Sequence, residues 1–205
     1  SPDAPRPGRR DWLAFDRSDR IGLVALLVAV VLGGAVAWLV APVVSWARGA
    51  ALAVPFTSAV EVPGLDGTGL RWRAASYDLL VDDPSTRQRL LDLLPGLGYL
   101  AIVAAACWLL LRIIGDIGRE DPFPPHNVRR LRMLAGLLAF GWPVVFFAEA
   151  TCRFAILTGL DLGDLGPRTS FTLPVLVVVA GVALALLAEA FKAGSRLRDD
   201  VEGLV

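Results

Sequence analysis

Four long stretches that are almost free of charge constrain this chain more than any other feature. Residues 21–47, 93–111 and 169–188 contain no Asp, Glu, Lys or Arg, and residues 133–160 contain only Glu149 and Arg153. About 20 apolar residues in a helix, each rising about 1.5 Å, cross the hydrocarbon core of a bilayer. All four stretches are long enough, so the sequence predicts an integral membrane protein with four transmembrane helices.

The composition supports this interpretation. Hydrophobic residues make up 55% and charged residues 20% of the 205-residue chain, and its mean hydropathy is +0.59. A soluble domain is typically about 45–50% apolar and about 25% charged. The first stretch is too long for the apolar part of a secretory signal. We therefore expect it to be retained as a membrane anchor.

The distribution of basic residues predicts the orientation of the chain in the membrane. Of the 20 Lys and Arg residues, thirteen lie before the first stretch, between the second and third, or after the fourth. Basic residues near the ends of spans favour the cytoplasmic side. Both termini and the loop between the second and third spans are therefore expected in the cytoplasm.

Together these patterns predict an all-α transmembrane fold. It is a four-helix bundle with both termini inside and a small extracytoplasmic β-hairpin cap between helices 1 and 2. The expected order is a cytoplasmic segment at 1–20, transmembrane helices at 21–47, 93–115, 128–160 and 169–192, extracytoplasmic segments at 48–92 and 161–168, a cytoplasmic loop at 116–127 and a cytoplasmic tail at 193–205.

Residues 48–92 have the pattern of a small cap. Residues alternate in side-chain character within 56–62 and within 70–74, and a turn-forming stretch rich in Pro and Gly separates these two segments. A third strand at 76–81 is an alternative extension. Asp83 as an N-cap, with Pro84 after it, predicts a short helix before the second span. We favour a lid that seals the helix ends over a ligand-sensing surface.

Glu149 and Arg153 are the charged residues expected inside a span. Ionisable side chains there cost roughly 2.5–3.5 kcal/mol on insertion scales and are usually paired or functional. Their i, i+4 spacing, with the acid first, favours an ion pair within one helix. We favour a structural pair, and the alternative is a proton, ion or ligand role. The sequence offers no second acid on another segment at that depth, which speaks against a transporter.

Recognisable catalytic and metal-binding patterns are absent from the sequence. It contains no GxxxxGK[ST], HExxH or GxSxG motif, and His126 is its only histidine. Cys107 and Cys152 lie within apolar spans, where we interpret them as buried hydrophobic residues rather than a disulfide. We therefore expect no metal, no cofactor and no enzymatic activity.

The loop before the third span concentrates rigid and basic residues. Pro122 and the Pro124–Pro125 pair end the second span, and Pro125 or Asn127 begins the third helix. Three arginines follow in its first turns, where the helix dipole disfavours positive charge. Two partners for them remain open, namely anionic lipid headgroups and the acidic residues of the tail. The residues concerned are Arg129, Arg130 and Arg132, and Asp199, Asp200 and Glu202.

The loop and the tail resemble one known family. A Pro-Phe pair, an Asn and an Arg-Leu-Arg run lead into the third span, and the chain closes on AEAFKAGSRLRDDVEGLV. This combination resembles domain-of-unknown-function family 2975, a group of small bacterial four-span membrane proteins, over nearly the whole chain beyond residue 20. The positions that match are Pro122, Phe123, Asn127, Arg130 and Arg132 in the loop, and Phe191, Gly194, Leu197, Asp200 and Val205 in the tail. The resemblance implies a regulatory setting with a small helix-turn-helix regulator as partner, and it implies no reaction.

The resulting hypothesis is a non-enzymatic, regulatory or interaction module whose cytoplasmic loop and tail dock a protein partner. Its expected interaction residues are Pro122, Phe123, Asn127, Arg129, Arg130, Arg132, Phe191, Gly194, Leu197, Asp199 and Asp200. Membrane lipids and a second copy of the chain are further expected partners, and direct nucleic-acid binding is not expected. The alternative function is a small transporter or channel-like protein that uses Glu149 and Arg153.

Overall fold

The computed structural model describes residues 17–58, 75–116, 125–160 and 174–202. Within these ranges, four helices are long and apolar enough to cross a membrane, judged by length and composition: Ser18–Ala47, Thr86–Asp116, His126–Leu157 and Val175–Gly194. The four expected transmembrane helices are therefore present in a multi-pass arrangement. Their boundaries differ from the expected ones, above all at the start of the second helix, which lies at Thr86 rather than at residue 93.

Two of the four helices contain a short π-helix. The first consists of α1 (Arg17–Ala35), η1 (Val36–Val40) and α2 (Ala41–Ala47), and the third consists of α4 (Pro125–Gly136), η2 (Leu137–Gly141) and α5 (Trp142–Leu157). In each case a proline, Pro42 or Pro143, is the second residue after the π-helix. Proline lacks an N–H donor and its ring collides with the preceding turn. The wider π turn, closed by hydrogen bonds from Ala41 and Trp142 to carbonyl groups five residues earlier, lies directly ahead of each proline.

The second helix, α3 (Thr86–Asp116), runs without a break and includes Pro95. The short helix expected around Asp83–Asp92 is the beginning of α3 rather than a separate element. Its start also differs from the prediction, because Ser85 and not Asp83 caps it. The Ser85 hydroxyl accepts from the Gln88 N–H at 3.3 Å, and Gln88 Oε1 accepts from the Ser85 N–H at 2.8 Å. This reciprocal arrangement is a capping box.

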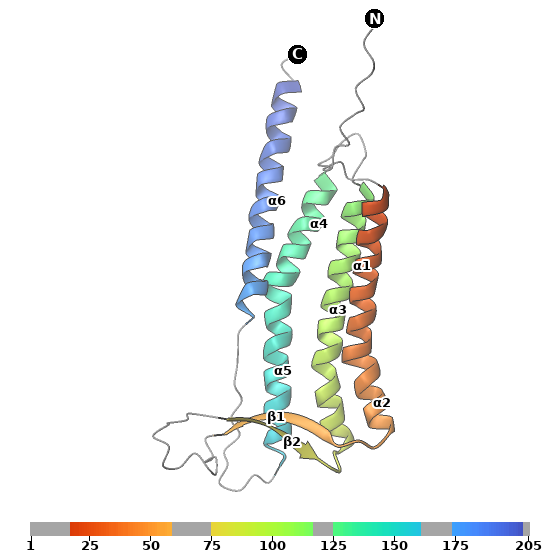
Figure 1. Ribbon diagram of the computed structural model, residues 1–205. Helices are drawn as coiled ribbons and strands as arrows, with labels where there is room; N and C mark the ends of the chain where they lie inside the picture. Colours follow the sequence, from red (N-terminus) through yellow and green to blue (C-terminus); the bar gives the residue numbers. More distant parts are fainter. Residues whose placement is uncertain (1–16, 59–74, 117–124, 161–173, 203–205) are drawn as a thin grey trace, which may run out of the picture.

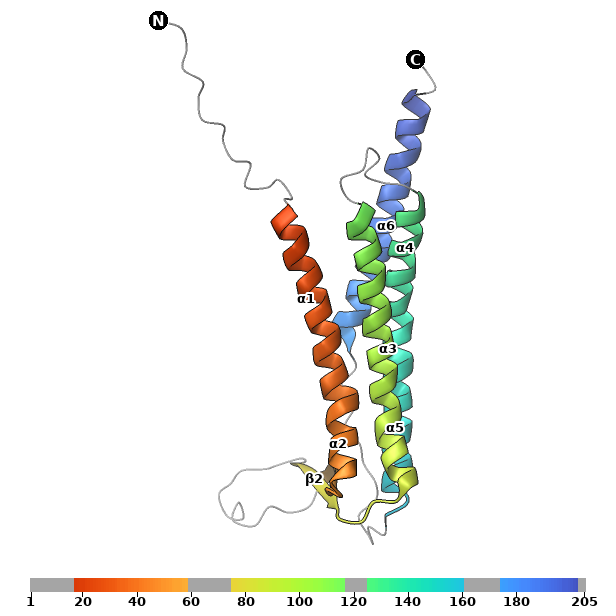
Figure 2. The ribbon, with the colours of Figure 1, turned by 90° about the vertical axis from the view of Figure 1, so that its right-hand side faces the viewer.

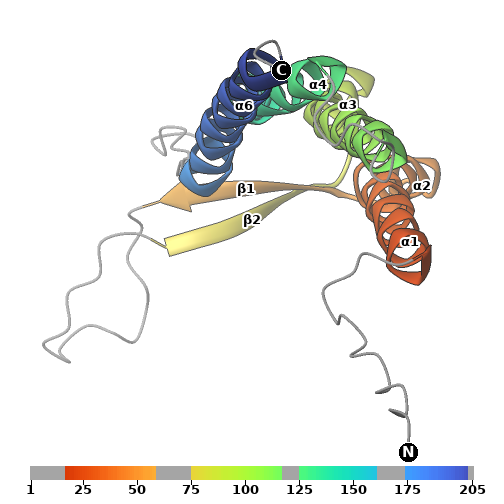
Figure 3. The ribbon, with the colours of Figure 1, turned by 90° about the horizontal axis from the view of Figure 1, so that it is seen from above.

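The helices form an open arc when viewed along their axes (Figure 3). Helix α1 packs against α3, α3 packs against α4 and α5, and α4 and η2 pack against α6 (Val175–Glu202). Helices α1 and α6 lie at the two ends of the arc. Helix α6 is displaced along the bundle, so that its last turns lie beyond the ends of α3 and α4 (Figure 1).

Glycines mark close contacts between helices. A Cβ atom on Gly96 of α3 would lie 2.9 Å from the Trp38 carbonyl oxygen in η1. A Cβ on Gly181 of α6 would lie 2.7 Å from the Ala139 nitrogen in η2. Gly33 has no neighbour within 4 Å of such an atom. Both π-helices are therefore approached closely by a glycine of the adjacent helix.

A two-stranded antiparallel hairpin closes one end of the helices. Strand β1 (Leu52–Ser58) pairs with β2 (Ala75–Val81), with Leu52 opposite Val81 and Ser58 opposite Ala75. Strand β2 thus contains residues 76–81, which the sequence indicated only as an optional third strand. Residues 59–74 lie outside the described part of the chain. The hairpin, α2, the start of α3 and the end of α5 share one end of the molecule, which we call the hairpin end (Figures 1 and 2). The opposite end, where α6 finishes, is the tail end.

The hairpin is anchored to the end of α5 by an apolar cluster. Leu52 and Val54 of β1 pack with Ile156 and Leu157 of α5, and all four are buried. Neighbouring leucines and valines of β2 and α3 surround this cluster. The contact holds the hairpin against the end of α5.

Candidate functional site

The polar site at the hairpin end is built around Glu149 of α5. One carboxylate oxygen, Oε1, pairs with Arg153 one turn later on the same helix. The other, Oε2, accepts a hydrogen bond of 2.7 Å from the Tyr99 hydroxyl of α3. Both oxygens of Glu149 are therefore engaged. The i, i+4 spacing indicated the first contact, whereas sequence reasoning missed Tyr99, a lone hydroxyl-bearing residue in an apolar stretch.

Aromatic rings enclose Tyr99 on two sides. Its ring centroid lies 5.8 Å from that of Trp38 and 4.9 Å from that of Trp142, with tilted planes in both pairs. Trp38 belongs to η1, and Trp142 is the first residue after η2. A residue of η1 and the residue directly after η2 thus supply the rings beside Tyr99. Tilted rings at such distances are a favourable geometry for aromatic pairs.

A cavity of about 230 Å³ lies beside this group, between the first helix, α3 and α5. Its lining is mixed: aromatic rings and apolar side chains surround a few polar groups. The residues that matter for its chemistry are Trp38, Asp92, Gly96, Tyr99, Glu149 and Arg153. A second acid from another helix therefore lies close to the ion pair. The expectation that no such acid exists was wrong, because α3 begins at Thr86 and carries Asp92 on its second turn.

Asp92 differs from Glu149 in its contacts. Within the described residues it makes no hydrogen bond and no ion pair. The charges of Arg153, Glu149 and Arg89 act on it from a distance. Arg153 is held by Glu149, and a guanidinium N–H of Arg89 donates to the Ala50 carbonyl at 2.7 Å. The Asp92 carboxylate, which is exposed, remains available on the cavity lining.

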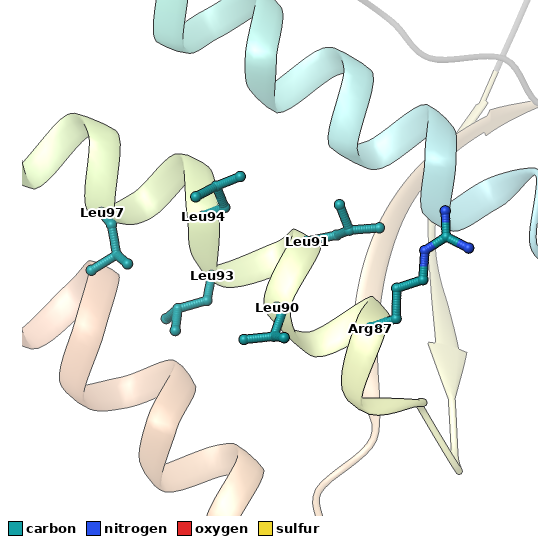
Figure 4. Close-up of a pocket in the computed structure, with 6 residues that line it drawn as sticks. All are labelled: Arg87, Leu90, Leu91, Leu93, Leu94 and Leu97. Atoms are coloured by element: carbon teal, nitrogen blue, oxygen red, sulfur yellow. The ribbon is translucent and has the colours of Figure 1, made fainter.

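A second hollow on α3 has a different character (Figure 4). It measures about 420 Å³ and is lined by Arg87, Leu90, Leu91, Leu93, Leu94 and Leu97. Five of these six side chains are leucines, and Arg87 lies at the hairpin end of the row (Figure 4). This surface suits hydrocarbon rather than a polar ligand.

A separate polar network lies near the tail end, where α3 ends and α4 begins. Asp116 is only 9% exposed. Its Oδ2 pairs with the Arg130 guanidinium and lies 2.8 Å from His126 Nε2. Arg130 also donates to Asn127 Oδ1 at 2.8 Å. The network joins α3 to α4 across residues 117–124, which lie outside the described part of the chain.

The family model described as "Protein of unknown function (DUF2975)" matches residues 47–205. The chain belongs to family DUF2975. The match starts at the last residue of α2, later than the resemblance from residue 20 onward, and it covers the hairpin and α3 to α6. No curated protein and no solved structure matches the chain significantly.

The DUF2975 loop motif has structural partners within the helices. Asn127 and Arg130 belong to the Asp116 network, and Arg132 of α4 pairs with Glu189 of α6. Two of the three arginines thus face carboxylates of neighbouring helices, a role the sequence did not indicate. Arg129 is exposed. Pro122 and Phe123 lie outside the described residues.

The tail positions of DUF2975 lie on α6 or beyond it. Phe191 is half-buried, and Gly194 is exposed with no atom within 4 Å of an added Cβ. Leu197, Asp199 and Asp200 are within the helix, but their side chains fall outside the described part of the chain, as does all of Val205. A contact between the arginines and the acidic tail therefore stays a prediction.

The cysteines of this DUF2975 chain are both unbridged. Cys107 on α3 and Cys152 on α5 are buried. Across the ranges 17–58, 75–116, 125–160 and 174–202, no group of three or more His, Cys, Asp or Glu side chains is arranged to hold a metal ion. The candidate sites are thus the hairpin-end cavity and the tail-end network.

Proposed function

We propose that this member of DUF2975 is a non-enzymatic protein of the bacterial inner membrane whose cytoplasmic face docks a soluble protein. In this arrangement the tail end lies in the cytoplasm, with both termini, and the hairpin end lies outside. The excess of basic residues in the segments at the tail end supports that orientation. The resemblance to four-span partners of helix-turn-helix regulators supports a small regulator as the docked protein.

The observation that carries the proposal is the extension of α6. Its charge-free stretch ends at Ala188, whereas the helix continues to Glu202 through a segment rich in charged residues. Residues 195–202, which include Arg196, Arg198, Asp199, Asp200 and Glu202, add about 12 Å of helix at about 1.5 Å per residue. Figure 1 shows this part beyond the ends of α3 and α4. A charged helix of this kind, continuous with a membrane span, offers an ordered surface to a protein at the membrane.

The pairing of Arg132 with Glu189 supports the same view. It fixes α4 to α6 just before the extension begins. Arg129, the fifth residue of α4, is exposed, and α4 begins at the tail end. The docking surface therefore consists of residues 195–202 of α6 together with Arg129.

Site-specific photocrosslinking in native membranes tests the proposal. A photoreactive residue at position 200 should give a discrete adduct with one soluble protein. The same residue at position 78, in β2, is the matched control and should give none. Replacement of Arg129 with Glu should weaken the adduct at position 200. Equal adducts at both positions, or adducts with lipid alone, would contradict docking at the tail end.

A second candidate function is transport of a small solute or ion through the hairpin-end cavity. The observation in its favour is that Asp92 on α3 joins Glu149 and Arg153 on α5 around one cavity. Transporters place ionisable residues from several helices around an internal site. Flux into liposomes containing the purified chain, measured for wild type and Glu149→Gln, distinguishes the two. Equal flux in both would remove this candidate.

A further inference from the structure

The lining of the hairpin-end cavity combines three features that together suit one class of ligand. It has a carboxylate, that of Asp92, which has no hydrogen-bond or ion-pair partner among the described residues. It has aromatic rings, those of Trp38 and Tyr99, and it has apolar walls from Pro42, Leu91 and Ile156. Cations bind over the faces of Trp and Tyr rings, and a carboxylate supplies the opposite charge. We propose that the cavity binds a small organic cation, an ammonium group carrying an apolar substituent.

The spacing of residues on α3 creates this site. Asp92, Gly96 and Tyr99 follow at i, i+4 and i+7 and therefore share one face of the helix. Gly96, between the carboxylate and the ring on this face, contributes no side chain. The same glycine allows the first helix to approach, since an added Cβ would lie 2.9 Å from the Trp38 carbonyl oxygen. A single small residue thus allows Trp38 to reach the lining of the cavity.

The charges around the cavity favour a positively charged ligand. The Glu149 carboxylate is occupied on both oxygens, by Arg153 and by the Tyr99 hydroxyl. Arg89, the other basic residue acting on Asp92, is directed to the Ala50 carbonyl. Asp92 is therefore the polar group on the lining that lacks an N–H donor among the described residues. An incoming ammonium group supplies that donor, and its apolar substituent covers the rings.

The size of the cavity limits the ligand. Pockets for drug-sized molecules typically measure about 300–1,000 Å³, whereas this cavity measures about 230 Å³. Benzylammonium, which combines one ammonium group with one ring, is a suitable probe. Benzyl alcohol and benzoate have nearly the same shape and differ in charge. The series separates recognition of charge from simple burial of an aromatic ring.

Binding of these three probes to the full chain in detergent, measured by calorimetry and by the fluorescence of its tryptophans, tests the site. We expect benzylammonium to bind in preference to the other two, and Asp92→Asn to weaken its Kd by about tenfold or more. Tyr99→Phe, which retains the ring, should change the Kd far less. Asp83→Asn removes an exposed acid near the same end of α3 and is the matched control.

Benzoate binding as tightly as benzylammonium would overturn the assignment. So would an unchanged Kd in Asp92→Asn, measured on protein whose unfolding transition matches that of the wild type. The proposed site is independent of docking at the tail end, because the photocrosslink at position 200 and the benzylammonium titration report on opposite ends of the molecule. Liposome flux is likewise a separate measurement, since a binding site need not transport its ligand.

Discussion

The Tyr99 hydroxyl of α3 donates a 2.7 Å hydrogen bond to Glu149 on α5, and this contact joins two helices inside the apolar part of the molecule. The same carboxylate holds Arg153 on its other oxygen. Glu149 therefore has two roles, as an acceptor between helices and as a counter-ion within its own. Its surroundings explain how a charge is accommodated in a membrane-capable helix.

Tyr99→Phe should destabilise the protein modestly. The change removes the hydroxyl and keeps the ring between Trp38 and Trp142. Hydrogen bonds between helices in membrane proteins contribute about 0.6 kcal/mol on average and about 1.7 kcal/mol at most, and we expect a loss in this range. Denaturant titration in mixed micelles measures it. Phe140→Leu, at a ring that is 75% exposed, is the control, and an equal effect there would contradict a specific role for the hydroxyl.

Arg130→Gln should destabilise the protein strongly, because it removes one member of the buried ion pair in the tail-end network. It leaves Asp116, which is 9% exposed, without its guanidinium partner. Removing one member of a buried ion pair costs about 3–5 kcal/mol, and the remaining contact to His126 should keep the loss near the lower value. The double variant Asp116→Asn/Arg130→Gln should recover most of the stability. Arg129→Gln, at an exposed position of the same helix, should have little effect. Additive losses in the double variant would argue against the pair.

Gly181→Ala should loosen the packing of α6 on the third helix. The new Cβ would meet backbone atoms, 2.7 Å from the Ala139 nitrogen and 2.9 Å from the Ala135 oxygen. Backbone cannot move aside as the end of a side chain can, and overpacking typically costs about 1–3 kcal/mol. Thermal unfolding in detergent measures the loss. Gly33→Ala, where the added atom has open space, should be neutral or stabilising, and a similar loss at both glycines would refute the packing argument.

Ser85→Ala should fray the start of α3. It removes the acceptor of the Gln88 N–H and half of the capping box. Loss of such a cap typically costs about 1 kcal/mol. Hydrogen exchange at the amides of residues 87–89 should become faster, while exchange in the middle of α3 should not change. Thr86→Ala, one residue later, is the control, and equal acceleration in that variant would contradict the capping role of Ser85.

The four spans were predictable because each needs only a long apolar stretch, a property that no tertiary contact alters. The ion pair between Glu149 and Arg153 was predictable because it depends on spacing within one helix. The sequence placed the start of the second span too late. The charge-free stretch begins only after Asp92, and Asp92 was therefore assigned to the cap. The Ser85-x-x-Gln88 pattern was the local signal that places it earlier.

The rest of the hairpin-end site depends on how separate helices pack. Trp38, Tyr99 and Glu149 come from three helices, and no spacing along the chain brings them together. Tyr99 was an inconspicuous residue in an apolar run. The register of β1 and β2 likewise depends on the anchoring of Leu52 and Val54 against α5. Alternation within the segments was a weaker guide, because it indicated only an optional strand where β2, Ala75–Val81, lies.

The two π-helices have a consequence for how each span is oriented along its length. A turn closed five residues back holds one residue more than an α-helical turn, so it acts as a one-residue insertion. Successive residues of an α-helix are about 100° apart around its axis. Positions before η1 or η2 are therefore out of phase, by about that angle, with positions after it. One periodic pattern cannot describe the lipid-facing side of the whole span. Each of these two helices presents one side to its neighbours at the tail end and a different side at the hairpin end, where the rings of Trp38 and Trp142 meet Tyr99.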